Sequence, residues 1–510
     1  MRPRQFPPWH RKPDPKPFTH LITMIPQSAI SDLARKICGR ILQAGDAAYD
    51  AVVKIDNGRV QRRPRIIIQP QNYSDVAETL KFAIAHQAVF TVKGGGHSAA
   101  GYCLNDNGIV LDMRPLNKIS YDSKKQTLTA QMGVIWYDVY KYMVDTGTGL
   151  FPVGGGCPTV APPGFMQGGG YSFVSRSYGM SIDNLEGMKV VTPDGKLRHV
   201  GHHSKTAEDK DLFWALRGGG GGNFGIVLEM EMRMQPPRTE KMLVGQIRYP
   251  LERAGEVLSY YNEWVEKIPD EMSCYGFCGH QPDAINKSAN VKVLGLTPVF
   301  NGDWAKGMEL IKGLTKFAPI YADLRNMTLP EWEFYNGTTT LVANRSAYIR
   351  SSMVPAGGMG LKTAKVFMDY MNACPSPYTF AVWTLGGGAI SKHKSDETAF
   401  YHREAKFIPE VKSIWDADSP GDARANVEWA YDFFEDLNKA SGATGAYVNY
   451  IDPLQTDWAR MYYGSNYKRL LKIKKQIDPK NVFSFLQSIG SPFEPDGRRP
   501  LDLNPLNRTV

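Results

Sequence analysis

A histidine and a cysteine, each next to a run of glycines, are the residues with the clearest chemical potential. Gly94-Gly95-Gly96 follows Val92 and Lys93 and leads into His97 and Ser98. Three consecutive glycines carry no Cβ, so backbone amides can approach an anion closely, and a pyrophosphate would fit such a loop. A plain tight turn is the alternative. The loop is neither a GxGxxG segment entering a helix nor a Walker loop, because no Gly-Lys-Ser or Gly-Lys-Thr follows.

The cysteine belongs to a second glycine-rich stretch, Gly154-Gly155-Gly156-Cys157-Pro158-Thr159-Val160. A cysteine among glycines has no bulky neighbour to bury it, so its thiolate could meet a ligand, although a buried inert thiol is the commoner outcome for a lone cysteine. Two more glycine runs follow: Gly168-Gly169-Gly170 before Tyr171, and Gly218 to Gly222 before Asn223, Phe224, Gly225 and Ile226. Backbone without side chains can lie against a flat or phosphorylated ligand.

The glycine loops lie among segments that alternate between strand and helix patterns. The order of elements over residues 65–92 predicts a βαβ unit. Helix patterns with apolar residues three and four apart cover residues 30–42, 74–86 and 134–146. Strand patterns cover residues 65–69, 89–92, 109–112, 127–131, 185–192 and 224–234.

The sequence pattern changes after Pro236, where the glycine-rich stretch ends. Helix patterns at residues 252–267 and 305–317 alternate with strands such as 291–299, and we interpret residues 236–440 as a second α+β domain. Residues 441–510 contain a further helix pattern at 466–477. Cys274 and Cys278 are expected to be buried small hydrophobic residues.

The composition indicates a folded protein with more than one domain. The chain has 510 residues, 42% hydrophobic and 22% charged, with a formal net charge of +9. Its basic residues are scattered, so we expect no nucleic-acid partner. Six cysteines without metal-binding spacing predict no metal site. No apolar run is long enough for a membrane span, and no apolar signal segment is visible near the N-terminus, so we expect a cytoplasmic protein.

Together, the glycine loops, the histidine and the cysteine resemble the berberine bridge enzyme-like branch of the vanillyl-alcohol oxidase superfamily, over residues 60–235 and 445–490. Further patches match the family in the same order. They are Arg176-Ser177-Tyr178-Gly179, Asp183-Asn184, Asn223-Phe224-Gly225-Ile226-Val227, Tyr447-Val448-Asn449-Tyr450, Asn466-Tyr467-Lys468-Arg469-Leu470, and the run from Asp478-Pro479 to Gln487-Ser488.

The resemblance implies a two-domain α+β fold. Residues 26–235 would form a PCMH-type FAD-binding domain of two α+β subdomains. Residues 236–440 would form a substrate-binding domain, an antiparallel sheet flanked by helices. Residues 441–510 would return to the FAD domain and the active site, and residues 1–25 would be a flexible leader.

The resemblance also implies FAD held by two covalent bonds, from His97 to the flavin 8α carbon and from Cys157 to ring carbon C6. The other cofactor-binding residues are carried over by the same likeness. They are Lys93, Gly94, Gly95, Gly96, Ser98, Val160, Gly168, Gly169, Gly170, Gly222, Asn223, Gly225, Ile226 and Asn449.

The implied activity is an oxidase that moves a hydride from a CH–OH or comparable C–H bond of a carbohydrate or secondary metabolite to flavin N5. Molecular oxygen would reoxidise the flavin and leave as hydrogen peroxide, which the small Val160 favours. Tyr450 is the expected base and Tyr171 a second pocket residue. Because a tyrosine pKa is ordinarily about 10, a positive neighbour or the flavin must lower that of Tyr450. Tyr447 and Asn449 are expected to point away from the pocket as support, since alternate residues of a strand face opposite sides.

Some positions depart from the family pattern. Pro162 and Pro163 replace residues of a Thr-Val-Gly-x-Gly-Gly-His segment, and Lys93 stands where arginine is common. Leu385 stands where a strand often presents a polar residue, so that Thr384 is a possible replacement. These departures leave two alternatives open: a dehydrogenase with another electron acceptor, and a flavin-binding protein whose catalytic pocket has lapsed.

Two histidine-containing pairs have structural interpretations. His202-His203 lies in a polar turn, where we expect both side chains to be exposed rather than to bind a metal. His402-Arg403 resembles a family segment, and we expect it to support packing in the second domain.

Overall fold

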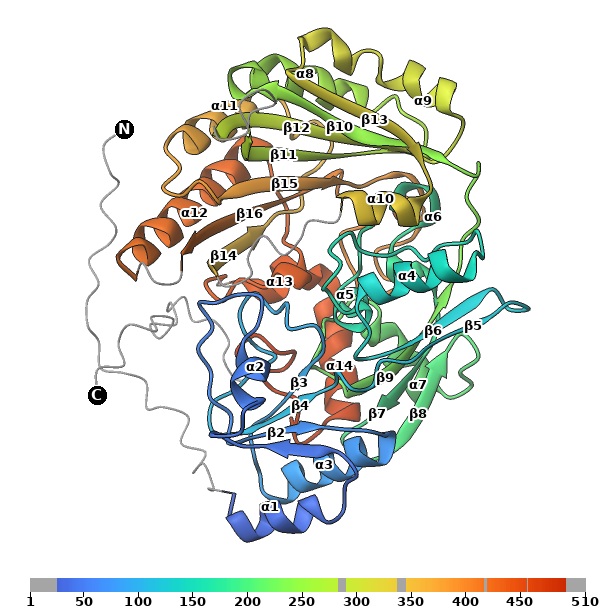
Figure 1. Cartoon of the computed structure of the whole chain (residues 1–510), viewed down its shortest axis with the longest axis vertical. Coiled ribbons are helices and arrows are strands. Elements are labelled where there is room, and N and C mark those ends of the chain that lie inside the picture. The colour runs from blue at the N-terminus through green and yellow to red at the C-terminus, as the bar shows by residue number, and fades with distance from the viewer. Residues whose placement is uncertain (1–24, 283–289, 337–344, 417–419, 456, 492–510) are drawn as a thin grey trace.

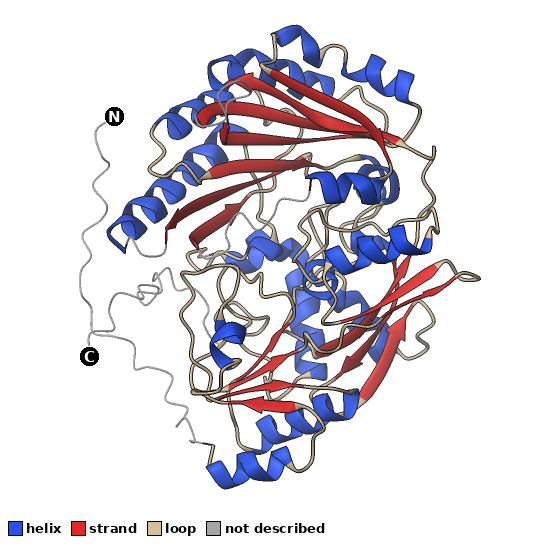
Figure 2. Cartoon of the chain, viewed as in Figure 1, coloured by secondary structure: helices blue, strands red, loops and turns tan. Residues whose placement is uncertain are grey.

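The computed structural model describes residues 25–282, 290–336, 345–416, 420–455 and 457–491. Three β-sheets organise these residues. Two smaller sheets occupy the lower half of the molecule in Figure 1, and one large sheet occupies the upper half, with helices over its outer face (Figure 2). The α+β class, with an antiparallel sheet flanked by helices, is confirmed.

The first small sheet contains the predicted βαβ unit. Its strand order is β1 (Arg40–Leu42), β2 (Ile66–Gln69), β4 (Ile109–Asp112) and β3 (Phe90–Lys93), and β4 pairs in parallel with both β2 and β3. Helix α3 (Tyr73–Ala85) connects β2 to β3, and the Asn72 side chain accepts a hydrogen bond from Asp75 N at its N-terminus. The helix predicted over 74–86 and the strand over 109–112 are therefore confirmed.

The helix predicted over residues 30–42 is wrong in its second half. Helix α1 (Gln27–Ala34) ends early, and Arg40–Leu42 pairs with β2 as an edge strand. A Cβ at Gly39 would lie 2.4 Å from the Gln69 carbonyl oxygen, so the chain can approach β2 this closely only at a glycine. Apolar residues with helical spacing continue past Ala34, but this segment forms backbone hydrogen bonds with β2 instead of extending the helix.

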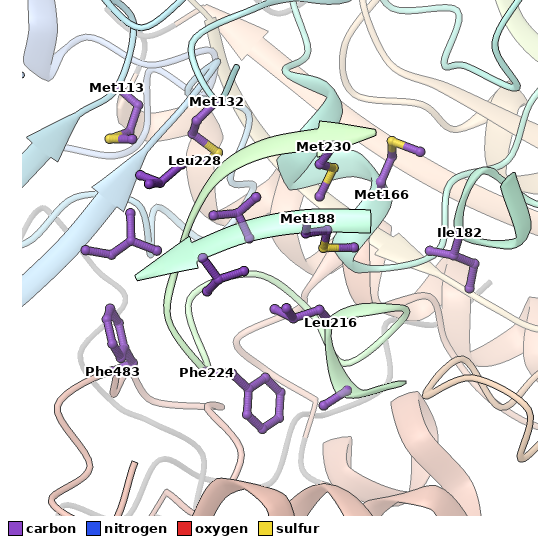
Figure 3. Close-up of a cluster of buried hydrophobic side chains, with 14 of the residues drawn as sticks. Met113, Met132, Met166, Ile182, Met188, Leu216, Phe224, Leu228, Met230 and Phe483 are labelled. Atoms are coloured by element: carbon purple, nitrogen blue, oxygen red, sulfur yellow. The ribbon is translucent and has the colours of Figure 1, made fainter. Parts of the chain in front are cut away.

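The second small sheet is antiparallel. Its order is β5 (Ile119–Asp122), β6 (Thr127–Gln131), β9 (Ile226–Arg233), β7 (Leu185–Val191) and β8 (Leu197–Gly201). Its associated helices are α4 (Trp136–Thr146) and α7 (Ala207–Leu216), and the shorter helices α5 (Pro162–Gln167) and α6 (Ser175–Tyr178) lie between β6 and β7. The short helix α2 (Tyr49–Val53) belongs to the first small sheet, between β1 and β2. The core of this half includes Met188 and Met230 from neighbouring strands together with Phe483 from the far end of the chain (Figure 3).

The large sheet has one apolar face covered by helices. Its order is β13 (Tyr321–Met327), β10 (Met242–Pro250), β12 (Asn290–Phe300), β11 (Met272–Pro282), β15 (Phe380–Leu385), β16 (Phe407–Asp416) and β14 (Arg345–Ser351), with antiparallel pairing throughout. Helices α8 (Ala254–Trp264), α11 (Leu361–Asn372) and α12 (Pro420–Ser441) pack on it, with α9 (Trp304–Ile311) nearby. Cys274 and Cys278 are buried in this core, as predicted. The helix predicted over 305–317 is instead α9 followed by a separate 3₁₀ turn, Leu314–Phe317.

Helices from the later part of the chain make contacts between the two halves of the molecule. Helix α10 (Leu329–Asn336) leaves the large sheet and packs against α4. Helices α13 (Trp458–Tyr463) and α14 (Tyr467–Ile477) return the chain to the small sheets, where Leu470 and Ile473 are buried. Among the described residues, no helix has both the length and the apolar character needed to cross a membrane.

Arg403 ties the two halves together, so the role of His402-Arg403 extends beyond the expected support of packing in the second domain. The fully buried guanidinium donates to both carboxylate oxygens of Asp183, at 2.7 and 2.8 Å. His402 donates through Nε2 to the Met461 carbonyl oxygen at 2.7 Å, in the returning C-terminal segment. Both side chains thus make contacts beyond the large sheet, which local sequence could not reveal.

Candidate functional site

His97 and Cys157 meet at one hydroxyl group. The Thr159 hydroxyl lies 2.9 Å from His97 Nε2 and 3.8 Å from Cys157 Sγ. The other ring nitrogen of His97, Nδ1, lies 3.6 Å from a carboxylate oxygen of Asp56. The two residues are 60 positions apart in sequence, yet a single side chain bridges them.

Burial favours the neutral forms of His97 and Cys157. It lowers the pKa of the His97 imidazole, against the effect of the Asp56 carboxylate. It also raises the pKa of the Cys157 thiol, against the effect of the Lys412 ammonium. The resting site therefore holds a neutral imidazole and a thiol, so any thiolate must form during reaction rather than beforehand.

The glycine loops pack against one another, and their lack of side chains permits it. A Cβ at Gly95 would lie 2.7 Å from the Thr159 carbonyl oxygen. A Cβ at Gly168 would lie 2.0 Å from Asn449 Oδ1. The run that begins at Gly218 is held to the end of α5, because Gly218 N and Gly220 N both donate to the Gln167 carbonyl oxygen. Four glycine-rich segments therefore converge on one region.

Several residues that the family resemblance assigns to the cofactor make hydrogen bonds within the protein. Lys93 Nζ donates to Asp112 at 3.2 Å, and the Ser98 hydroxyl accepts from Tyr102 N. The Asn223 side chain donates to carbonyl groups of its own glycine run and accepts from Ile489 N. These side chains shape the loops.

The remaining expected residues line or close the same loops. The Val160 carbonyl accepts from Trp136 N, the first residue of α4, and Ile226 is buried at the start of β9. Gly96, Gly169, Gly170, Gly222 and Gly225 adopt positive φ angles, and Gly94 packs against Met132 and Ala161.

Tyr447 and Asn449 support the glycine loops, as expected, but their side chains point toward these loops rather than away from them. Val448–Tyr450 forms a 3₁₀ turn rather than a strand, so side chains do not alternate between two faces. The Tyr447 hydroxyl accepts from Gly170 N at 2.7 Å and from Asn449 Nδ2 at 2.8 Å. Its ring lies 5.4 Å from the rings of both Tyr450 and Tyr171, centre to centre.

Two charged residues of β16, Glu410 and Lys412, complete the site and were missed by the sequence analysis. Lys412 Nζ lies 3.0 Å from a Glu410 carboxylate oxygen and 5.5 Å from the centre of the Tyr450 ring. Burial works to lower the pKa of Lys412, but the Glu410 carboxylate raises it, so the ammonium stays charged. The available signal was two charges at alternate positions of an otherwise apolar strand pattern, which places both on one face.

Tyr450 is a buried phenol beside that ion pair. Burial first, and then the Glu410 carboxylate, raise its pKa well above the ordinary value. The positive neighbour that the base role needs is present in Lys412, but Glu410 offsets it. At neutral pH the residue is therefore protonated in the resting protein.

Buried polar atoms without hydrogen-bond partners gather here, which fits a site built for another group. Within the described ranges they include Tyr171 Oη, Thr384 Oγ1 and Glu410 Oε2. Buried polar atoms in native proteins are almost always paired, so a set of unpaired ones indicates a missing partner. The side-chain-free loops and these atoms together suit a large planar cofactor with a phosphate-containing tail.

The departures from the family pattern do not disrupt this arrangement. Pro162 and Pro163 are the first two residues of α5, where backbone amides have no partner within the helix. Leu385 faces the helix-covered core of the large sheet, while the neighbouring Thr384 faces the opposite side. The polar replacement suggested at Thr384 is therefore sterically reasonable.

The histidine pair at 202–203 lies away from these loops. Both residues are exposed, and the His202 ring packs edge-on against Phe213. In the part of the chain that the structure describes, no three His, Cys, Asp or Glu side chains gather in a way that could hold a metal ion.

Comparison with known proteins identifies the family. A model of the FAD binding domain matches residues 64–201, and a model described as berberine and berberine like matches residues 446–490. An uncharacterized FAD-linked oxidoreductase of Bacillus subtilis (strain 168), YgaK, is 30% identical over 460 residues, covering 89% of this chain and 97% of the relative. The chain belongs to the berberine bridge enzyme-like family of FAD-linked oxidoreductases.

A further relative and two solved structures match the chain over most of their length. Reticuline oxidase of Papaver somniferum is 25% identical over 462 residues, covering 84% of each chain. The solved structure of BBE-like 1 from Physcomitrella patens superposes with a TM-score of 0.79 at 22% identity, over 90% of this chain and 98% of that one. A chitooligosaccharide oxidase superposes with a TM-score of 0.77 at 23% identity, over 91% and 99%. These likenesses confirm the PCMH-type two-domain fold of berberine bridge enzyme-like proteins.

Proposed function

We propose that this enzyme is an oxidase whose FAD is attached covalently to both His97 and Cys157. The observation that carries the proposal is the shared Thr159 hydroxyl, which lies 2.9 Å from the imidazole and 3.8 Å from the thiol. Two nucleophilic side chains this close can bond two neighbouring edges of one flavin ring. The substrate would be a carbohydrate or secondary metabolite with a CH–OH or comparable C–H bond.

The glycine loops would hold the remainder of the cofactor. Gly94 to Gly96 and Gly168 to Gly170 offer backbone amides without side chains, and Gly222 with Gly225 extends this surface. Asn449 and Tyr447 keep the loop at Gly168 in place through the hydrogen bonds described above. Bound in these loops, FAD would supply the redox chemistry, in which a hydride moves to flavin N5 and molecular oxygen takes up the two electrons to give hydrogen peroxide.

Tyr450 and Glu410 would together remove the substrate's hydroxyl proton. Because the resting Tyr450 is a phenol, it must release its own proton as it receives one from the substrate. Glu410 lies beside it with an unpaired carboxylate oxygen to accept that proton. Lys412 stays positively charged next to both and stabilises negative charge that develops on the phenol oxygen. Tyr171, whose buried hydroxyl has no described partner, is proposed as a second pocket residue.

The choice of oxygen as the electron acceptor is supported by Val160. This small side chain lies three residues after Cys157 and is only partly buried. A dehydrogenase that uses another acceptor is the second candidate. Turnover with and without oxygen separates the two.

The test begins with acid precipitation of the purified protein. Flavin colour that stays in the pellet supports the tether, and flavin in the supernatant refutes it. His97→Ala and Cys157→Ala should each retain one covalent bond, while the double variant should release its FAD. Peroxide release across a panel of alcohols, sugars and amines then identifies the substrate.

A further inference from the structure

A buried carboxyl group without a partner lies next to the glycine loop that carries Cys157. Glu333, on α10, has 3% of its surface exposed. Neither of its carboxylate oxygens has a hydrogen-bond partner among the described residues. No step of the proposed oxidation uses this group.

Glu333 points toward the glycine loop that carries Cys157. A Cβ at Gly156 would lie 3.1 Å from Glu333 Oε2 and 3.3 Å from the Phe173 ring, so the glycine lets this loop lie close against the carboxyl group. Phe173 stacks against Tyr275, with ring centres 4.2 Å apart, and meets Trp332 edge-on. The carboxyl group therefore sits among aromatic rings beside a tether residue.

Among the described residues, no cation compensates a charge at this position. Burial alone raises the pKa of Glu333 to about 8. The ionisable groups that sense it are the phenols of Tyr140 on α4 and Tyr275 on β11, both with raised pKa values because they are buried. An unpaired buried carboxyl destabilises a fold, and such groups persist mainly where function requires them.

We propose that Glu333 binds an ammonium group of the substrate, at a subsite formed by Glu333, Gly156, Phe173 and Tyr275. The substrate class is then a compound that carries a protonated or quaternary amine in addition to the C–H bond that is oxidised. Aromatic ring faces attract cations, and a cation supplied by the ligand would neutralise the carboxylate. A neutral hydroxyl would provide a hydrogen bond but would leave any negative charge uncompensated. This inference rests on the proposed function and narrows its substrate.

The arrangement links cation binding to proton release. In the resting protein below pH 8 Glu333 is mainly protonated, and a permanent cation binds best after that proton has left. With a pKa of about 8 the ionised fraction rises about tenfold between about pH 7 and about pH 9, and the affinity for a permanent cation should rise by the same factor. The phenols of Tyr140 and Tyr275 remain protonated over this range, because their pKa values are raised well above the ordinary value.

The test uses the flavin-containing full-length protein and isothermal titration calorimetry. Choline is the charged probe, and the alcohol in which carbon replaces its nitrogen is the neutral probe of the same shape. Wild-type protein should bind choline at least about tenfold more tightly than the neutral alcohol, a difference of about 1.4 kcal/mol. Glu333→Gln should remove this preference and the pH dependence, since it mimics the protonated acid and preserves the resting fold. Glu331→Gln, the same change at an exposed residue of α10, should keep both.

Either of two results would overturn the proposal. The first is no preference for choline in the wild type, including no measurable binding. The second is an unchanged preference in Glu333→Gln. Retention of flavin in the acid pellet is measured on the same samples, so the subsite can fail while the oxidase assignment stands, and the reverse can also be seen.

Discussion

Replacing Tyr450 by phenylalanine tests the assignment of the base most directly, because it removes one oxygen atom and little else. The ring keeps its contact with Tyr447, at 5.4 Å between centres, and its position under the Lys412 ammonium at 5.5 Å. The loss of one buried hydroxyl changes the free energy of unfolding by about 1 kcal/mol, so the variant should fold and keep its tether. The flavin spectrum should stay nearly unchanged.

The rate of flavin reduction should fall steeply in this variant. A positioned acid–base group contributes about 10²- to 10⁴-fold, which corresponds to roughly 3–5 kcal/mol of barrier. Glu410 would remain in Tyr450→Phe but would lack the phenol that carries the proton from the substrate. The proposed relay works from the protonated phenol, and burial and Glu410 raise the pKa of Tyr450 well above its ordinary value. The wild-type rate should therefore not rise as the pH approaches the ordinary tyrosine pKa of about 10.

The assay is anaerobic stopped-flow measurement of flavin bleaching, with the substrate found in the peroxide screen. Tyr121→Phe, the same change on the edge strand β5, is the control and should keep the wild-type rate. A Tyr450→Phe rate within threefold of the wild type, with an intact flavin spectrum, would refute the role of Tyr450. The base would then have to act without this phenol.

Three further outcomes are expected from the contacts described. Thr159→Val keeps the shape of the side chain but removes the hydroxyl that bridges His97 and Cys157, so the fraction of covalently bound flavin should fall. Mass spectrometry of the flavin-bearing peptides measures this fraction. Full attachment in the variant would show that the hydroxyl is not needed for bond formation. Arg403→Met leaves the Asp183 carboxylate buried without the arginine and should lower the free energy of unfolding, measured in urea, by about 3–5 kcal/mol. A loss under about 1 kcal/mol would contradict the stabilising role of the Arg403–Asp183 ion pair. Burial lowers the pKa of His402 from 6.5 to about 4. Above pH 6.5 the ring is neutral in both the folded and the unfolded chain. As the pH falls from 6.5 toward 4 the unfolded chain binds the proton and the folded chain does not, so the free energy of unfolding should drop by about 3 kcal/mol in total. Unfolding of the wild type near pH 7 and near pH 4, compared with His402→Gln, measures this loss, and an equal loss in both proteins would contradict it.

Local patterns in the sequence were sufficient for the loops and for most of the elements near them. The strands at 109–112 and 127–131 and the helix over 74–86 follow from short-range periodicity and capping, which act between residues a few positions apart. Glycine runs next to a histidine and a cysteine predicted the cofactor region through their resemblance to a known family, since short motifs are local properties of the chain. The helix predicted over 30–42 was wrong in its second half, because residues 40–42 pair with a strand distant in sequence despite their helical spacing of apolar residues.

The composition of the site itself depended on tertiary structure. Thr159 reaches both His97 and Cys157 only because the loops pack on each other, and no spacing in the sequence encodes that distance. Glu410 and Lys412 face the site because the other face of β16 packs beneath the helices of the large sheet.

The sequence by itself therefore determined the cofactor loops, the family and the two candidate tether residues of this enzyme. Tertiary structure alone decided that Glu333 is buried without a partner and that Tyr447 turns into the site through a 3₁₀ turn. The physical reason is that backbone conformation and side-chain type are local properties. Burial, charge pairing and the resulting pKa values are created only when distant segments exclude water together.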